Sequence, residues 1–133
     1  MSLAELTVPA DPSFVGLVRL VVGQCARQAG VAQDRVEDVK LAVDEAMANA
    51  VRARHTAGTR RPVTLAFGPT VRGFEVVIHD IDAQSSPDDE GSTGLVELVD
   101  PALSFTLIEG LGDAVDYRHD DASTDLWLLI ASD

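Results

Sequence analysis

The stretch LAVDEAMANAV, residues 41–51, is the most informative part of this chain of 133 residues. Apolar residues in and before it recur at helical spacing, at Val36, Val39, Val43, Ala46 and Ala50. This spacing predicts an amphipathic helix with one buried face. Glu45 and Asn49 lie four residues apart, so the helix presents a carboxylate and a carboxamide on one side. The carboxylate can accept a proton or orient a water, and the amide oxygen is a hard ligand suited to Mg²⁺. A solvated helix edge is the alternative interpretation of such a pair.

Length and composition limit the class of protein. The chain is long enough for one domain, residues 1–133, with its own core. Apolar residues make up 46% and aromatic residues only 5%, which predicts a core of Val, Leu, Ile and Ala. No stretch approaches the ~20 apolar residues of a membrane span, and residues 1–10 lack the basic start of a signal peptide. Cys25 is the only cysteine, which excludes an internal disulfide. We therefore expect a cytoplasmic protein.

The net charge of −12 comes from 22 acidic residues against 10 Lys and Arg. Such a surface repels nucleic acid phosphates, so we expect no direct contact with DNA or RNA. It suits a basic protein partner, because complementary potentials steer association. Ordinary solubility explains the charge equally well, and composition does not separate the two.

Two long helices are expected in the first half of the chain. Asp11-Pro12-Ser13 places a capping side chain before a proline, which is typical of a helix start, and Gly30 is expected to end this helix. Asp34 is expected to cap the second helix, which runs to about Arg54. We interpret Arg52 and Arg54 as a solvated helix end whose cations suit the helix dipole, with contact to phosphates or a partner as the alternative.

The rest of the pattern completes a two-layer fold. Strands are expected at Ala4–Pro9, Val63–Phe67, Phe74–Asp80, Ala114–His119 and Asp125–Ala131. Residues 82–101 are too polar for a core and are expected to form a lid-like loop, followed by a short third helix at Ala102–Leu111. The sum is an α/β sandwich with about three helices on one face of a mixed sheet of about five strands.

The Glu-Ala-Met-Ala-Asn-Ala-Val run at residues 45–51 resembles the N-box of the GHKL (histidine-kinase-like) ATPases. It looks most like the branch of bacterial anti-sigma factors that are also serine-protein kinases. The order of the expected elements is similar to the GHKL (Bergerat-like) fold over nearly the whole chain. By this resemblance Glu45 would be the general base, and Asn49 the Mg²⁺ ligand that bridges to the phosphates of ATP.

Three further segments carry the resemblance. Val76-Val77-Ile78-His79-Asp80 resembles the strand that ends in the family's D-x-G-x-G, which implies that Asp80 accepts a hydrogen bond from the adenine amino group. Residues 102–113 resemble the start and continuation of the family's third helix. Ser123-Thr124-Asp125-Leu126-Trp127-Leu128 resembles the G-T-x-x-x-L element, which implies that Thr124 contacts the adenine side.

The chain departs from the family pattern at four glycine positions of the cofactor site, which it fills with Asp82, Gln84, Ala102 and Ser104. Glycine there lets the backbone approach the nucleotide and exposes N–H groups to the phosphates. Side chains crowd this space, and Asp82 adds negative charge where a triphosphate is expected. These departures predict that binding of ATP and Mg²⁺ is weakened or lost.

Two hypotheses about function therefore stay open. The first is an ATP-dependent kinase that phosphorylates a serine on a STAS-type anti-anti-sigma protein and otherwise sequesters a sigma factor, by the general plan of phosphoryl transfer. The second is a catalytically inactive module of the same fold that keeps its protein contacts and no longer binds ATP. The resemblance also implies a non-covalent homodimer.

Overall fold

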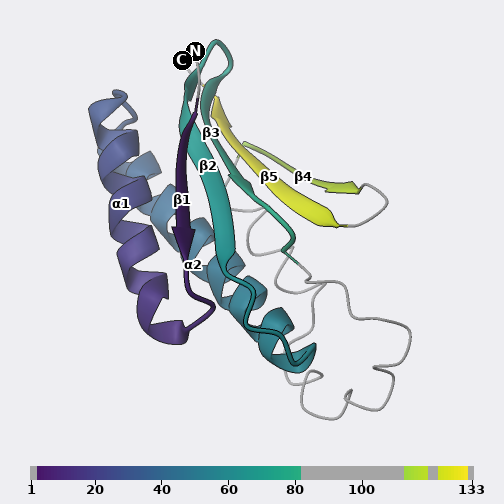
Figure 1. The fold of residues 1–133 in the computed structure, drawn as a ribbon. Helices are drawn as coiled ribbons and strands as arrows, with labels where there is room; N and C mark the ends of the chain where they lie inside the picture. The colour runs from purple at the N-terminus through teal and green to yellow at the C-terminus, as the bar shows by residue number, and fades with distance from the viewer. Residues whose placement is uncertain (1–2, 82–112, 120–122, 132–133) are drawn as a thin grey trace.

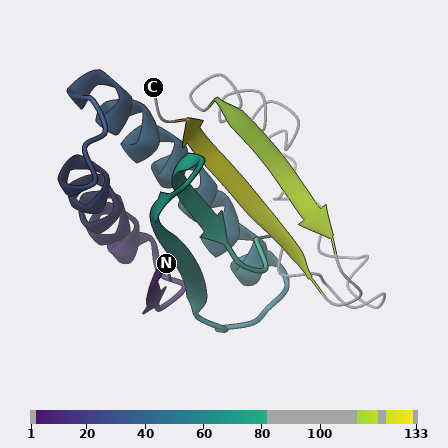
Figure 2. The ribbon, with the colours of Figure 1, turned by 90° about the horizontal axis from the view of Figure 1, so that it is seen from above.

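The structure is a computed structural model that describes residues 3–81, 113–119 and 123–131, and the statements below concern these residues. Their elements, in chain order, are β1 (Ala4–Val8), the 3-10 helix η1 (Pro12–Phe14), α1 (Val15–Gln28), α2 (Gln33–Thr56), β2 (Val63–Thr70), β3 (Gly73–Ile78), β4 (Ala114–His119) and β5 (Thr124–Ala131). Both α-helices lie on the same side of the sheet (Figures 1 and 2). The predicted two-layer α/β sandwich is therefore confirmed.

The sheet has the strand order β1-β2-β3-β5-β4, and every neighbouring pair in it is antiparallel. It is thus antiparallel among the described residues, rather than mixed as predicted. The short connection between β2 and β3 forms a hairpin, which joins only antiparallel strands. The strand order places β3 at the centre of the sheet, and the register sets its Val76 opposite Leu128 of β5.

The boundaries of α1 agree with the local sequence. Asp11 Oδ1 accepts a hydrogen bond from the Ser13 N–H at 2.9 Å, which caps the η1 turn leading into α1. At the other end Gly30 has φ +91°, and the Val31 N–H donates to Ala26 O at 3.1 Å. This is a Schellman ending, which favours glycine at the left-handed position.

The start of α2 differs from the prediction. Ala32 is the N-cap in an extended conformation without a side-chain capping bond, so the predicted cap at Asp34 is wrong. Asp34 lies in the first helical turn, where its charge suits the positive end of the helix dipole. The packing of this helix on the sheet is confirmed, and its buried residues are Val36, Val39, Ala42, Val43, Ala46, Met47, Ala50, Val51 and Arg54.

The neighbouring strands β3 and β5 are buried to different degrees. In β3 the residues alternate: Phe74, Val76 and Ile78 are buried against the helices and those between them are half-buried. In β5 the outward-facing Trp127 is also buried, because Arg72 lies over its ring at 5.0 Å. Arg118 also lies over this ring, at 4.6 Å, so two cations cover the open face of the sheet at this point.

In the described part of the chain, neither α-helix has the length and apolar character that crossing a bilayer requires. The expected lid-like loop at residues 82–101 and the third helix at Ala102–Leu111 lie outside the described residues. These two expectations stay predictions.

Candidate functional site

The chain turns sharply just after β3, where Asp80 has a left-handed backbone with φ +54°. This region is unfavourable for most residues other than glycine, and aspartate is among those that tolerate it. Asp125 holds the turn, since its Oδ1 accepts the Asp80 N–H at 2.9 Å and its Oδ2 lies 3.2 Å from His79 Nδ1. The Ile81 N–H donates to Thr124 O at 2.8 Å. Strand β5 therefore fixes Asp80 from the side of the sheet.

Arg54 holds the same turn from the side of the helices. It lies in the last turn of α2, and only 1% of its surface is exposed. Its Nη1 donates to Asp80 O at 2.9 Å and to Ala50 O at 3.1 Å, and its Nε donates to Arg61 O at 3.1 Å. The prediction of a solvated helix end is therefore wrong for Arg54, because three carbonyl groups inside the protein satisfy its guanidinium.

The two oxygens of the Asp80 carboxylate have different surroundings. Oδ2 lies 3.0 Å from Nη2 of Arg61 and 3.9 Å from Nη2 of Arg54. Oδ1 is buried and has no hydrogen-bond partner among the described residues. Leaving a buried acceptor unsatisfied costs about 1–3 kcal/mol, and more for a charged group. This oxygen is therefore an acceptor suited to a donor supplied by a ligand.

Glu45 and Asn49 lie one turn apart on α2 and are both half-buried. Oδ1 of Asn49 accepts a hydrogen bond from Nη2 of Arg52 at 2.5 Å. An amide oxygen has two lone pairs and can accept from two donors. The carbonyl oxygen of Ala50, the next residue, accepts a hydrogen bond from Arg54, which also donates to Asp80 O in the turn after β3. One helix thus carries the acid–amide pair and Arg54.

The structure brings some of the predicted site residues together. Thr124 is 3% exposed and lies beside the turn that contains Asp80, as its hydrogen bond with Ile81 shows. The other predicted cofactor-binding residues, Asp82, Ala102 and Ser104, lie outside the described residues. The predicted cleft between Glu45, Asn49, Asp80 and residues 82–101 includes undescribed residues, so it stays a prediction. Below, the Asp80 site denotes Asp80 with Arg54, Arg61, Thr124 and Asp125.

Arg54, Arg61 and Asp125 were missed as parts of this site. Arg54 follows Ala46 and Ala50 at intervals of four along the apolar stripe of α2. Helical periodicity therefore placed a cation on the buried face, where it needs partners. Asp125 lies near the start of β5, which is otherwise mostly apolar. Its hydrogen-bond partner Asp80 lies 45 positions away in sequence. No local pattern connects the two.

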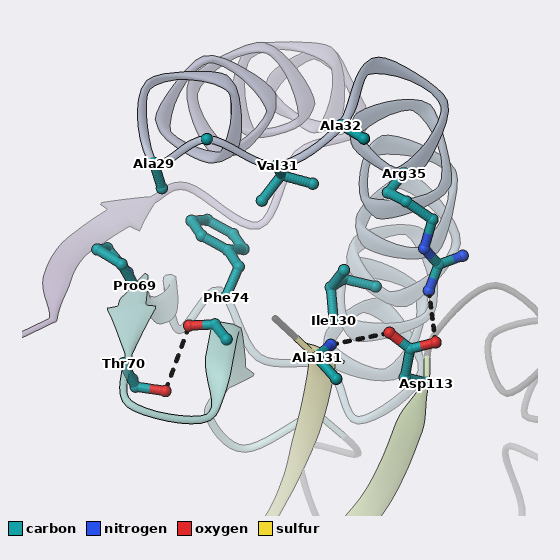
Figure 3. A pocket seen from close by; sticks show the side chains of 12 residues that line it. Ala29, Val31, Ala32, Arg35, Pro69, Thr70, Phe74, Asp113, Ile130 and Ala131 are labelled. Carbon is teal, nitrogen blue, oxygen red and sulfur yellow. Dashed lines mark hydrogen bonds and ion pairs between the residues drawn. The ribbon is translucent and has the colours of Figure 1, made fainter. Parts of the chain in front are cut away.

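A cavity of about 380 Å³ lies at the opposite end of α2, between the α1–α2 connection, the β2–β3 turn and the end of β5 (Figure 3). Nη2 of Arg35 lies 2.8 Å from Oδ1 of Asp113, whose Oδ2 accepts the Ala131 N–H at 2.8 Å. Arg35 precedes Arg54 by 19 positions, which is roughly 28 Å along an α-helix. The cavity is therefore separate from the Asp80 site.

The fold has a counterpart in a known class of proteins. The family described as histidine kinase-like ATPase domain matches residues 8–130, and the chain belongs to this family. The resemblance to the GHKL ATPases is thereby confirmed.

Several proteins that are similar to this chain are named serine-protein kinases. The chain is 31% identical over 128 residues to the serine-protein kinase RsbW of Bacillus velezensis and to that of Bacillus subtilis, which covers 90% of this chain and 80% of each relative. It is 34% identical over 124 residues to the serine-protein kinase RsbW of Halalkalibacterium halodurans, which covers 87% of this chain and 75% of the relative.

Proposed function

We propose that the chain binds an adenosine nucleotide at the Asp80 site and regulates transcription by binding a sigma factor, a STAS-type anti-anti-sigma protein, or both. In its enzymatic form it phosphorylates a serine of the anti-anti-sigma partner. Membership of the ATPase-domain family and similarity to serine-protein kinases support this proposal. The observation that carries it is the buried Oδ1 of Asp80, which has no donor among the described residues.

The residues of the Asp80 site fit the adenine end of ATP. An ionised carboxylate only accepts hydrogen bonds, and the 6-amino group of adenine donates them. Arg54 and Arg61 both lie beside Oδ2, so the oxygen left for the base is Oδ1. Thr124, buried next to the same turn, would contact the adenine side.

Glu45 and Asn49 would serve the phosphate end. MgATP supplies the phosphoryl group, and Mg²⁺ is usually held by one or two protein oxygens together with phosphates. The amide oxygen of Asn49, which accepts from Arg52 in the structure, is such a ligand. Glu45, one turn earlier, would accept the proton of the serine hydroxyl as general base.

The alternative is a catalytically inactive module of the same fold. Asp82, Gln84, Ala102 and Ser104 stand where the family places glycine, and this favours weak or absent nucleotide binding. The contacts with the sigma factor and the anti-anti-sigma protein would remain. In both forms we propose a cytoplasmic, non-covalent homodimer, and the net charge of −12 supports contacts with basic partner surfaces.

Calorimetric titration of MgATP tests the nucleotide part of the proposal. We expect weak binding by the native chain and its loss in Asp80→Asn and Asn49→Ala. Asp116→Asn is a matched control, because this carboxylate lies on β4 with 62% of its side chain exposed. Binding that Asp80→Asn leaves intact would contradict the site. No binding at millimolar MgATP would leave the inactive module.

A second experiment tests the partners. Purified chain is mixed with a sigma factor and a STAS-type protein from its native host, and complexes are recovered at increasing salt. We expect complexes that weaken as salt rises, because exposed charges are screened beyond about 8 Å at physiological ionic strength. Phosphoserine on the STAS-type protein after addition of MgATP would select the kinase over the inactive module. Recovery of neither partner, or a monomer by light scattering, would contradict this part of the proposal.

A further inference from the structure

We propose that Arg54 and Arg61 are positioning residues that set the base selectivity of the Asp80 site, favouring 6-aminopurine over 6-oxopurine nucleotides. This inference rests on the proposed function, since it requires the nucleotide base to lie at Asp80. It assigns a role to two arginines that are not themselves expected to touch the nucleotide.

Arg54 has little freedom in the structure. Its guanidinium donates to the carbonyl oxygens of Ala50, Arg61 and Asp80, and only 1% of its surface is exposed. The hydrogen bond to the Asp80 carbonyl fixes a residue whose backbone is already left-handed, at φ +54°. Arg54 therefore fixes the backbone position from which the Asp80 side chain extends.

The arginines also determine how the Asp80 carboxylate is turned. A carboxylate that rotates freely presents either oxygen to a ligand. Here Arg61 at 3.0 Å and Arg54 at 3.9 Å both lie on the side of Oδ2, and Oδ1 stays buried without a donor among the described residues. The two arginines thus hold Oδ2, and Oδ1 is left for the base.

This arrangement selects for a hydrogen-bond donor on the ligand. The 6-amino group of adenine donates to Oδ1, whereas the 6-oxo group of hypoxanthine would place a second acceptor against it. A site built to hydrogen-bond one group rejects an analogue that lacks it, because the buried polar atom is then left unpaired. We expect the native chain to bind ATP at least about tenfold more tightly than inosine triphosphate.

The test is calorimetric titration of ATP and of inosine triphosphate, each with Mg²⁺, into the native chain and three variants. Arg54→Lys keeps the charge but loses the planar fork that reaches several carbonyl groups at once. Arg61→Gln removes the closer contact with Oδ2 at a side chain that is 54% exposed, so the fold should survive. Arg60→Gln is the matched control, because the neighbouring arginine is exposed and no contact between it and Asp80 is seen among the described residues.

We expect the preference for ATP to fall at least about threefold in Arg61→Gln and further in Arg54→Lys, and to stay native in Arg60→Gln. Thermal unfolding shows whether Arg54→Lys is folded, and if it is not, Arg61→Gln decides alone. An unchanged preference in Arg61→Gln, or in folded Arg54→Lys, would overturn the inference. Loss of ATP binding in Asp80→Asn would in that case still support the nucleotide site. No nucleotide binding by the native chain would overturn this inference and the nucleotide part of the proposed function, and would leave the inactive module.

Discussion

An Arg–Asp ion pair fastens each end of α2 to the sheet layer, and the two pairs differ in their surroundings. At the N-terminal end Arg35 lies 2.8 Å from Asp113, with side chains 30% and 44% exposed. At the C-terminal end Arg54 lies 3.9 Å from Asp80, with side chains 2% and 20% exposed. The shorter pair lies partly in water, and the longer pair lies in the protein interior.

The surroundings of an ion pair, rather than the distance between its charges, therefore decide how much it contributes to the free energy of unfolding. Water can replace either partner of an exposed pair, so such pairs contribute about 0–1 kcal/mol. A buried cation that loses its partners remains without solvation, which costs about 3–5 kcal/mol. The end of α2 that is fixed inside the protein also lies beside Asp80, whose Oδ1 has no hydrogen-bond partner among the described residues. Rigid support of this kind is what a binding site needs.

The largest effect is expected from removing the arginine at each end in turn. Arg54→Met should lower the free energy of unfolding by about 3–5 kcal/mol, since three carbonyl oxygens lose the guanidinium donor and Asp80 keeps only Arg61 as an ion-pair partner. Arg35→Met should lower it by less than about 1 kcal/mol. Urea denaturation of both variants measures the difference. Equal losses would contradict the comparison.

A smaller effect is expected from the two carboxylates that each accept a backbone N–H. Asp125 accepts from Asp80 at 2.9 Å in a part-buried position, and Asp113 accepts from Ala131 at 2.8 Å in an exposed one. Asp125→Ala should cost about 1–3 kcal/mol, because the donor is left unsatisfied at a left-handed turn. Asp113→Ala should cost less, because water can replace the lost acceptor. A larger loss in Asp113→Ala than in Asp125→Ala would refute this ranking.

The smallest effect concerns acid stability at the exposed end. The hydrogen bond from the Ala131 N–H, and then the pairing with Arg35, hold the pKa of Asp113 below its ordinary value. Because the folded pKa is lowered, the unfolded state binds more protons as the pH falls. The contribution of Asp113 is therefore complete above the ordinary aspartate pKa of about 3.9 and is lost as the pH falls through the lower folded pKa.

The Asp113→Asn variant makes this pH dependence visible. Its deficit in unfolding free energy relative to the native chain should be present at neutral pH and should shrink as the pH falls through that acid range. Urea denaturation at a series of pH values gives the deficit directly. A deficit that stays constant down to the lowest pH at which the protein folds would show that the charge of Asp113 has no such role.

Local pattern predicted much of the fold and little of its connectivity. The bounds of β4, Ala114–His119, were predicted as observed, because the polar segments around it interrupt the apolar pattern. The antiparallel pairing was not predicted, since it depends on which strands become neighbours in the sheet. Asp34 was predicted as a cap from its residue type, yet the helix starts earlier, where Ala32 takes the extended conformation.

The candidate site shows the same limit. Glu45, Asn49 and Asp80 were found through motifs that are continuous in sequence. Arg54 was not, because the carbonyl of Asp80 lies 26 positions away and only the packing of α2 on the sheet brings the two together. Sequence therefore identified the groups that are proposed to meet the ligand, and the structure identified the groups that hold them.

The most direct test of this account is a crystal structure of the chain with a non-hydrolysable ATP analogue and Mg²⁺. We expect the adenine amino nitrogen to lie within about 3.2 Å of Oδ1 of Asp80, with Arg54 and Arg61 still on the side of Oδ2. An adenine bound elsewhere, such as in the cavity beside Arg35, would contradict it. So would a base at the Asp80 site that leaves Oδ1 without a donor.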